Sequence, residues 1–186
     1  MAQPLSSTKF TYEDYVLFPD DGRRHELIDG EHYVTPSPVT KHQKISGNLF
    51  GLLYSHIQKT KIGHLFAAPM DVVLSDLDVV QPDLLFISNA RVSIITEKNI
   101  QGAPDLVVEI VSESSRKTDE IVKRKLYERF RIAEYWIVDP ELESIKIYRC
   151  SDKGYSRIAE LSVEANDTLN SPLFPDWQLP LSKIFA

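Results

Sequence analysis

The amino-acid sequence predicts a mixed α/β domain built around a central β-sheet. Residues 105–112, DLVVEIVS, form a short and nearly continuous apolar run, which is typical of a central strand covered on both faces. Apolar residues recur at helical spacing between residues 39 and 59, and this spacing predicts a helix. Residues 144–150 and 154–161 alternate around a turn at Asp152–Gly154, which predicts a C-terminal hairpin.

The other elements follow from local signals along the chain. Thr11 and Asp14 have the spacing of a capping box and begin a short helix that Pro19 stops. The Asp29-Gly30 pair predicts the tight turn of an N-terminal hairpin. Further strands are predicted at residues 64–69, 71–75, 83–88 and 134–139, with a turn at Asp76–Asp78, a loop over residues 89–104 and a second helix over residues 117–131. The last residues, LSKIF, are expected to pack back on the body of the domain.

Length and composition exclude several classes of protein. A chain of 186 residues fits one domain, residues 1–186, and 42% hydrophobic with 26% charged residues argues against disorder. Cys150 is the only cysteine, so no internal disulfide can form, which favours the reducing cytoplasm. No apolar run approaches the ~20 residues that span a bilayer, and the start MAQPLSSTKF has no secretory signal. We therefore expect a cytoplasmic protein that is not membrane-bound, secreted or fibrous.

The charge balance leaves two interpretations open. The chain has 21 basic and 27 acidic residues, a net charge of −6 with neutral histidines. Nonspecific nucleic-acid binding usually depends on a surplus of basic residues, because these release counterions from the phosphates. The protein therefore either has no role with nucleic acid or carries a local basic rim around an acidic, metal-binding centre.

Glu109 is the most informative residue, because it stands inside the apolar run LVVEIV. Its own face of the strand carries Val107 and Val111, and the opposite face carries Leu106, Val108 and Ile110. Burial of an ionised carboxylate costs on the order of several kcal/mol in lost hydration, unless a cation compensates its charge. A cation is therefore expected over Glu109. The alternatives are a buried ion pair with an arginine and an edge position that reaches water.

Asp83 is the second candidate carboxylate. It follows Pro82 and opens the strand DLLFIS. Neighbouring strands lie about 4.8 Å apart, so Asp83 and Glu109 on adjacent strands could share one small cation. Magnesium prefers one or two carboxylates together with water and phosphate oxygens. Asp105 lies about 13 Å from Glu109 by strand rise, too far to share an ion, and is expected to be a strand-start or capping residue.

The helix at residues 117–131 offers a cation. Its apolar face consists of Val122, Leu126 and Phe130. Lys123 lies about 60° from the centre of this face and can reach the sheet, whereas Lys125 lies about 100° away on the other flank. Arg129 lies as close to the centre as Lys123, and Tyr127 follows Lys123 by one turn. The ordinary alternative is that Lys123 is a surface lysine whose charged end reaches solvent.

Other polar residues give weaker signals. Glu26, in HELIDGE, is ordinarily a solvent-facing strand residue. His42 and Lys44 begin a helix and could meet a phosphate, but an exposed first turn is the ordinary expectation. The five histidines have no metal-ligand spacing, and the sequence has no phosphate loop, dinucleotide glycine motif or GxSxG elbow.

Four runs of the sequence together resemble a known family. ELIDGE, VVQPDLLFIS, APDLVVEIVSESS and KRKLYERFRIAEYWIVD are similar to the Uma-two-type putative restriction endonucleases, a branch of the PD-(D/E)xK nuclease superfamily. The resemblance covers roughly residues 10–150. It implies a restriction-endonuclease-like fold, with a central mixed sheet flanked by helices and a β-hairpin near each end of the chain.

The resemblance also implies a metal site. In the superfamily pattern, an Asp on one strand and a Glu on the next hold Mg²⁺ beside a lysine, and Asp83 and Glu109 match these two acids. The backbone carbonyl of Ile110 matches a further metal ligand. Mn²⁺ would be a substitute ion.

The lysine of the pattern is displaced in this sequence. The expected position, two residues after Glu109, is Val111. Lys123, ahead of Tyr127, matches variants in which the lysine has moved to the next helix, and Glu26 matches an early glutamate of the family. If no lysine reaches the metal, the fold would bind without catalysing.

Three hypotheses of different classes follow. The first, implied by the resemblance, is an Mg²⁺-dependent DNA endonuclease with Asp83, Glu109, Lys123 and Glu26 as catalytic residues, acting as a homodimer that matches the symmetry of the duplex. The second is a catalytically inactive nuclease fold that serves as a binding or interaction module. The third is a structural role, in which Glu109 pairs with Arg129 or another arginine.

Overall fold

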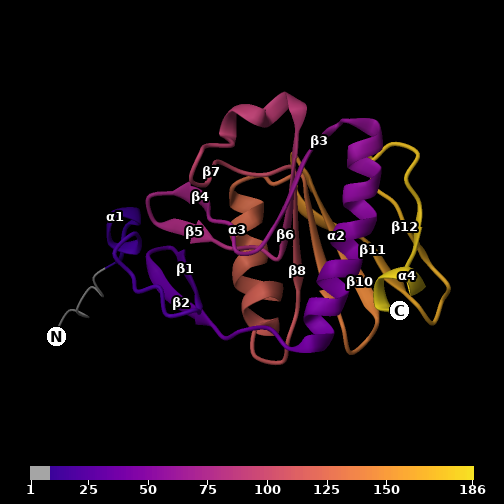
Figure 1. Ribbon diagram of the computed structural model, residues 1–186, viewed down its shortest axis with the longest axis horizontal. Helices are drawn as coiled ribbons and strands as arrows, with labels where there is room; N and C mark the ends of the chain where they lie inside the picture. The colour runs from indigo at the N-terminus through magenta and orange to yellow at the C-terminus, as the bar shows by residue number, and fades with distance from the viewer. Residues whose placement is uncertain (1–8) are drawn as a thin grey trace.

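The apolar run at residues 105–112 becomes an inner strand of a six-stranded sheet. The computed structural model describes residues 9–186 (Figure 1). Strand β8 (Leu106–Ile110) lies between β6 (Leu84–Ser88), to which it is antiparallel, and β9 (Glu134–Asp139), to which it is parallel. The strand order is β11-β10-β9-β8-β6-β3, in which β3 (Gly63–Ala67) and β11 (Gly154–Ser162) are the edge strands and β10 (Ser144–Ser151) lies between β11 and β9. Residues 1–8, from which the lack of a secretory signal was partly inferred, lie outside the described residues.

A second, five-stranded sheet is built on the N-terminal hairpin. Its order is β2-β1-β5-β4-β7, formed by β1 (Arg24–Ile28), β2 (Glu31–Thr35), β4 (Val72–Ser75), β5 (Asp78–Val80) and β7 (Ile100–Gln101). The predicted Asp29-Gly30 turn is present, with left-handed φ values of 53° and 72°. The expectation of one central sheet is therefore incomplete.

The strands between residues 63 and 88 divide between the two sheets. β4 folds back on β5, while β3 pairs with β6. Pro82 lies between β5 and β6 and has no backbone N–H to extend the pairing, so the chain changes sheets there. The predicted turn at Asp76–Asp78 is wrong at its last residue, since Asp78 already begins β5.

Helices cover both faces of the six-stranded sheet. α2 (Thr40–Thr60) packs on the face formed by Leu106, Val108 and Ile110. The opposite face, with Val107 and Val111, is covered by a π-helical turn, η2 (Thr118–Lys123), and α3 (Arg124–Arg129). Figure 1 shows α2 in front of the strands and α3 behind them. The two faces predicted for the strand around Glu109 are thus confirmed, although the second helix begins with a wider π turn.

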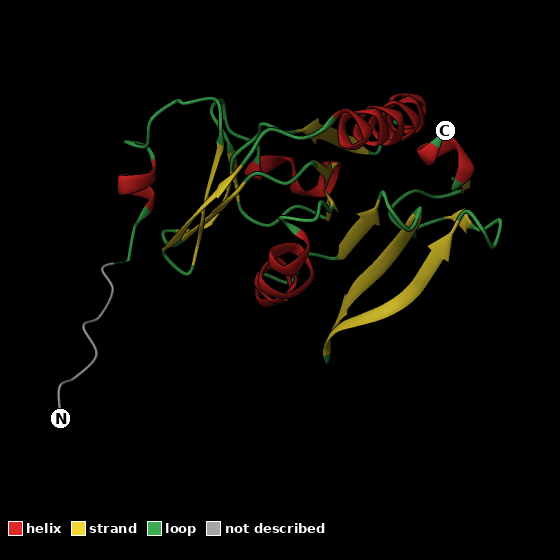
Figure 2. Cartoon of the chain, turned by 90° about the horizontal axis from the view of Figure 1, so that it is seen from below, coloured by secondary structure: helices red, strands yellow, loops and turns green. Residues whose placement is uncertain are grey.

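Short helices lie near both ends of the described chain. α1 (Tyr12–Tyr15) has the expected capping box, formed by Thr11 and Asp14. At the other end, Asn48 in α2 donates a hydrogen bond of 3.0 Å to the carbonyl of Ile184, and Figure 2 shows α4 beside α2. The remaining elements are a 3₁₀ turn, η1 (Asn89–Ile94), β12 (Thr168–Leu169), β13 (Leu179–Pro180) and α4 (Ser182–Phe185). In residues 9–186, the helices are all too short or too polar to cross a membrane.

Candidate active site

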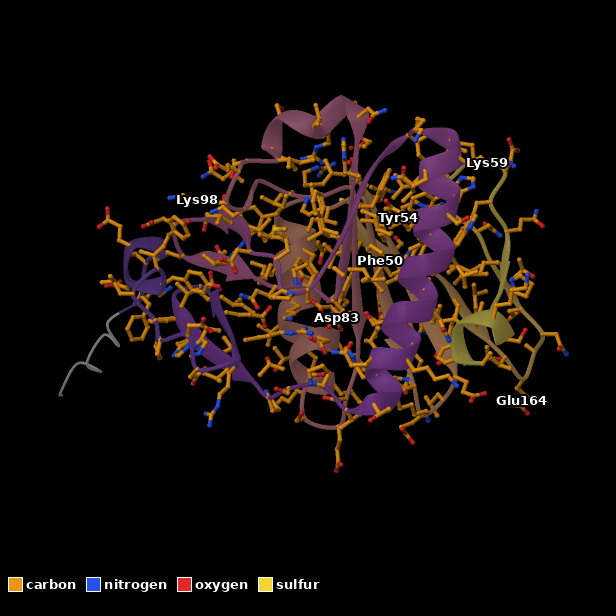
Figure 3. The ribbon with its side chains drawn as sticks, viewed as in Figure 1. Phe50, Tyr54, Lys59, Asp83, Lys98 and Glu164 are labelled. Atoms are coloured by element: carbon orange, nitrogen blue, oxygen red, sulfur yellow. The ribbon has the colours of Figure 1, made fainter. Side chains whose placement is uncertain are left out.

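Strand pairing brings Asp83 and Glu109 together. β6 and β8 pair with Leu84 opposite Val108, and one step further the same register places Asp83 opposite Glu109. Residues opposite each other in an antiparallel pair have their Cβ atoms about 5 Å apart on one face of the sheet. The Asp83 and Glu109 side chains are each 4% exposed. Asp83 lies between the β1–β2 hairpin and α2 (Figure 3).

Asp83 is held by groups from three elements. Its Oδ1 accepts a hydrogen bond of 2.6 Å from the guanidinium of Arg24 in β1. Its Oδ2 lies 3.0 Å from Nε2 of His42 in α2 and accepts a hydrogen bond of 2.8 Å from the backbone N–H of Ile110. Burial alone would raise the pKa of Asp83, but His42 and Arg24 together hold it below its ordinary value. Asp83 is therefore an ionised carboxylate.

Glu109 has a different environment. Its Oε1 accepts hydrogen bonds from Nζ of Lys123, at 3.0 Å, and from the hydroxyl of Tyr127, at 2.7 Å. Burial, together with the neighbouring acids Asp119 and Asp83, raises the pKa of Glu109 to about 8, although the charge of Lys123 opposes this shift. Without a further cation, Glu109 therefore keeps a proton at neutral pH.

Lys123 is the cation at Glu109. Its side chain is 6% exposed, and Nζ lies 2.9 Å from Oε1 of Glu26 and 3.7 Å from Oδ1 of Asp119. Although burial opposes its charge, the carboxylates of Glu109 and Glu26 raise the pKa of Lys123 well above its ordinary value. Burial likewise raises the pKa of Asp119 to about 6, and Lys123 opposes this shift. Lys123 is thus a permanent positive charge.

The other candidate cations lie elsewhere. Lys125 is exposed, and Arg129 donates hydrogen bonds of 2.6 Å to Asp29 and 2.7 Å to Asp78. Glu109 is therefore paired with a lysine and not with Arg129, as the structural hypothesis had it. An arginine pair does occur in the site, but at Asp83.

Two ordinary expectations from the sequence are wrong. Glu26 is 2% exposed and not solvent-facing, because its carboxylate turns toward Nζ of Lys123 and the backbone N–H of Gln81. His42 is 8% exposed, because the first turn of α2 turns this side chain toward Asp83, whereas Lys44 is exposed as expected. The Asp105 side chain accepts a hydrogen bond of 2.7 Å from the backbone of Ser88 at the far end of β8, so its expected structural role is confirmed.

Sequence reasoning missed Arg24 and Asp119. Both could have been found from periodicity. Arg24 lies two residues before Glu26 and so shares its strand face. Asp119 lies four residues before Lys123 on a helix, where such residues are neighbours.

The buried cluster has more acids than cations. Its acids are Glu26, Asp83, Glu109 and Asp119, and its permanent cations are Arg24 and Lys123. Four carboxylates against two cations leave two unbalanced negative charges when all four acids are ionised and His42 is neutral. The cluster lines a cavity of about 220 Å³, bordered also by residues 33–39 and by hydroxyl groups of Ser112, Ser114, Ser115 and Thr118.

A comparison with protein-family models assigns the chain to a family. The model of the Uma2 family, described as "Putative restriction endonuclease", matches residues 12–182, which is nearly the whole sequence. The chain belongs to the Uma2 family. This result confirms the family resemblance seen in the sequence. No curated protein matches the chain.

Solved structures match this Uma2 chain at low sequence identity. One is described as a putative nuclease belonging to DUF820 from Anabaena variabilis, with a TM-score of 0.79 and 19% sequence identity. The match covers 95% of this chain and 97% of that one, and it confirms the predicted mixed α+β fold. The type IIG restriction endonuclease BpuSI matches with a TM-score of 0.42 and 14% identity, over 81% of this chain and 16% of its own.

Among residues 9–186 of this Uma2 chain, no three His, Cys, Asp or Glu side chains lie together in an arrangement that could hold a metal ion. A carboxylate offers about four acceptor positions, of which Asp83 uses three and Glu109 uses two. Each acid therefore retains acceptor capacity on the edge of the cavity.

Proposed function

We propose that this protein is a metal-dependent endonuclease that hydrolyses phosphodiester bonds in DNA, with Mg²⁺ as its ion and Mn²⁺ as a substitute. Membership of the Uma2 family and the nuclease-like fold support the reaction class. The observation that carries the metal is the charge balance. With all four acids ionised and His42 neutral, the cluster lacks two positive charges, which is the charge of one divalent cation, and without that cation Glu109 keeps a proton.

Asp83, Glu109 and the carbonyl of Ile110 are the groups that would hold the ion. Carboxylate and carbonyl oxygens are the ligands that Mg²⁺ prefers. In a strand the N–H and C=O of one residue point the same way, and the N–H of Ile110 bonds to Asp83. The carbonyl of Ile110 thus faces the same strand edge. When bound, Mg²⁺ lowers the pKa of a coordinated water and offsets charge on the scissile phosphate.

The other residues of the site orient the reacting groups or stabilise developing charge. Because the pKa of Lys123 is raised well above its ordinary value, this residue stays charged and cannot accept a proton. Lys123 therefore orients the attacking water or stabilises the charge that develops on the phosphate. Glu26 and Glu109 hold its Nζ at 2.9 Å and 3.0 Å, and Tyr127 fixes Glu109 by its hydroxyl.

Plasmid cleavage with matched variants tests this function. We expect cleavage in Mg²⁺ or Mn²⁺ that stops on chelation. Asp83→Asn, Glu109→Gln and Lys123→Met should each lower the rate roughly 100-fold or more, as removal of one electrostatic group from a site does. The exposed controls are Asp76→Asn, Glu160→Gln and Lys125→Met, which should cut as the wild type does. Equal activity of all six folded variants would rule out the proposed site.

A catalytically inactive binding module is the second candidate, and one observation favours it. Both oxygens of Asp83 are engaged by Arg24, His42 and Ile110, so the ion must compete for this carboxylate. If this candidate is correct, titration calorimetry would show no divalent-ion binding that depends on Asp83, and the wild type and Asp83→Asn would give the same result. Cleavage that is lost on chelation would exclude this candidate.

A homodimer belongs to the same proposal. Double-strand cutting favours a dimer, because two sites related by a two-fold axis match the symmetry of the duplex. Sedimentation analysis should show a dimer of the 21.2 kDa chain. A monomer that cuts both strands would contradict this part of the proposal.

A further inference from the structure

Arg24 is the charged side chain of the cluster that reaches solvent. Its side chain is 21% exposed. The side chains of Lys123 and the four acids, Glu26, Asp83, Glu109 and Asp119, are between 3% and 6% exposed. Arg24 also lines the cavity. A negatively charged molecule that enters the cavity therefore meets this guanidinium before it meets Lys123.

The guanidinium is only partly used in the contacts seen here. Of its five N–H donors, one donates a hydrogen bond within residues 9–186, from Nη1 to Oδ1 of Asp83 at 2.6 Å. Four donors are left for another acceptor. Asp83 does not depend on Arg24 alone, because His42 and the N–H of Ile110 bind its other oxygen.

We propose that Arg24 binds the phosphate of the substrate strand, and that Asp83 holds the guanidinium at the cavity until the cation and substrate arrive. This inference rests on the proposed function. The planar fork of an arginine matches two oxygens of a phosphate, which a lysine cannot match. Once a divalent cation shares the charge of Asp83, the attraction between Asp83 and Arg24 falls, and the free donors are available to the phosphate.

The proposal predicts opposite effects on two ligands. In Arg24→Gln, Mn²⁺ measured by electron paramagnetic resonance should bind about tenfold more tightly, because a like charge beside Asp83 is gone. A labelled DNA duplex, measured by fluorescence anisotropy in Ca²⁺, should bind about tenfold more weakly, with a salt-dependence slope smaller by about one. If Arg24 merely supported Asp83, Arg24→Gln would bind both Mn²⁺ and DNA more weakly.

Arg23→Gln is the matched control. Arg23 is the neighbouring residue and carries the same charge, but its side chain is 64% exposed and pairs with Asp21 at 3.7 Å. Its loss should leave Mn²⁺ affinity unchanged and change DNA binding less than Arg24→Gln does. Arg24→Lys keeps a positive charge beside Asp83, so this variant controls for misfolding caused by loss of that charge. It should bind Mn²⁺ as the wild type does and DNA more weakly.

The outcomes separate this inference from the proposed function. If the wild type cuts DNA while Arg24→Gln binds DNA equally well, or binds Mn²⁺ more weakly, the role of Arg24 is overturned and the function stands. Wild-type DNA affinity in Arg24→Lys would likewise overturn the role of the fork. If the wild type neither binds nor cuts DNA, the proposed function fails and the role of Arg24 fails with it.

Discussion

At the residue scale, the protonation of Glu109 links the site to stability. The pKa of Glu109 is about 8 in the folded protein, whereas the ordinary pKa of a glutamate is 4.5. Between these values the folded protein keeps a proton that the unfolded chain has released, so the free energy of unfolding falls as pH rises. Glu109→Gln removes this titration. In a chelator, its stability should decline less steeply than that of the wild type between pH 5 and pH 8.

Denaturant unfolding at several pH values measures this difference. Glu160→Gln is the control, because the Glu160 side chain is 44% exposed, and it should keep the wild-type slope. Part of the slope below pH 6 should persist in Glu109→Gln, since the pKa of Asp119 is also raised, to about 6. Parallel curves for the wild type and Glu109→Gln would show that Glu109 is ionised in the folded protein.

The residues found from the sequence are those whose surroundings lie within one element. Glu109 was evident because it stands among five apolar residues in the run LVVEIV, and Lys123 because of its angle on one helix. The pairing of Arg24 and His42 with Asp83 could not be predicted in this way, because these residues lie on different elements and Arg24 lies 59 residues from Asp83. Asp119, by contrast, lies four residues before Lys123 on the same helical turn.

At the scale of elements, strand and helix positions followed local patterns but their assignment to sheets did not. α2 and β9 lie close to their predicted ranges because periodicity and propensity act within each segment. The division of β3, β4, β5 and β6 between two sheets depends on which strands pair. The π turn of η2 was also missed, since one extra residue per turn leaves the apolar spacing nearly helical.

Two glycines test how closely these elements pack. Gly63 begins β3, and a Cβ at this position would lie 2.6 Å from Cε2 of Phe86 and would also meet the carbonyl of Ile87. Gly63→Ala should therefore lower the free energy of unfolding by about 1–3 kcal/mol. Gly47 lies inside α2 with no atom within 4 Å of such a Cβ. Gly47→Ala should instead raise it by about 1 kcal/mol. Equal effects would mean that β3 and β6 are not packed as described.

At the scale of the whole molecule, the six-stranded sheet places the packing of the C-terminal segment and the Glu109–Lys123 pair on opposite faces. The face toward α2 is closed by the C-terminal segment, where Leu181 and Ile184 are fully buried and Trp177 stacks on Trp136 with ring centres 6.5 Å apart. Glu109 and Lys123 lie on the opposite side, next to Val107 and Val111. A cavity made beneath α4 should therefore cost stability without disturbing the acids.

Ile184→Ala tests this separation in the full-length chain. Its side chain is 0% exposed, so its truncation should lower the free energy of unfolding by about 2–5 kcal/mol. Leu142→Ala, at a residue that is 64% exposed, should leave stability nearly unchanged. Metal-dependent cleavage should match the wild type in both variants at a temperature where both are folded. A folded Ile184→Ala that has lost cleavage would show that α4 positions the acids through the sheet, and the two faces would then act as one unit.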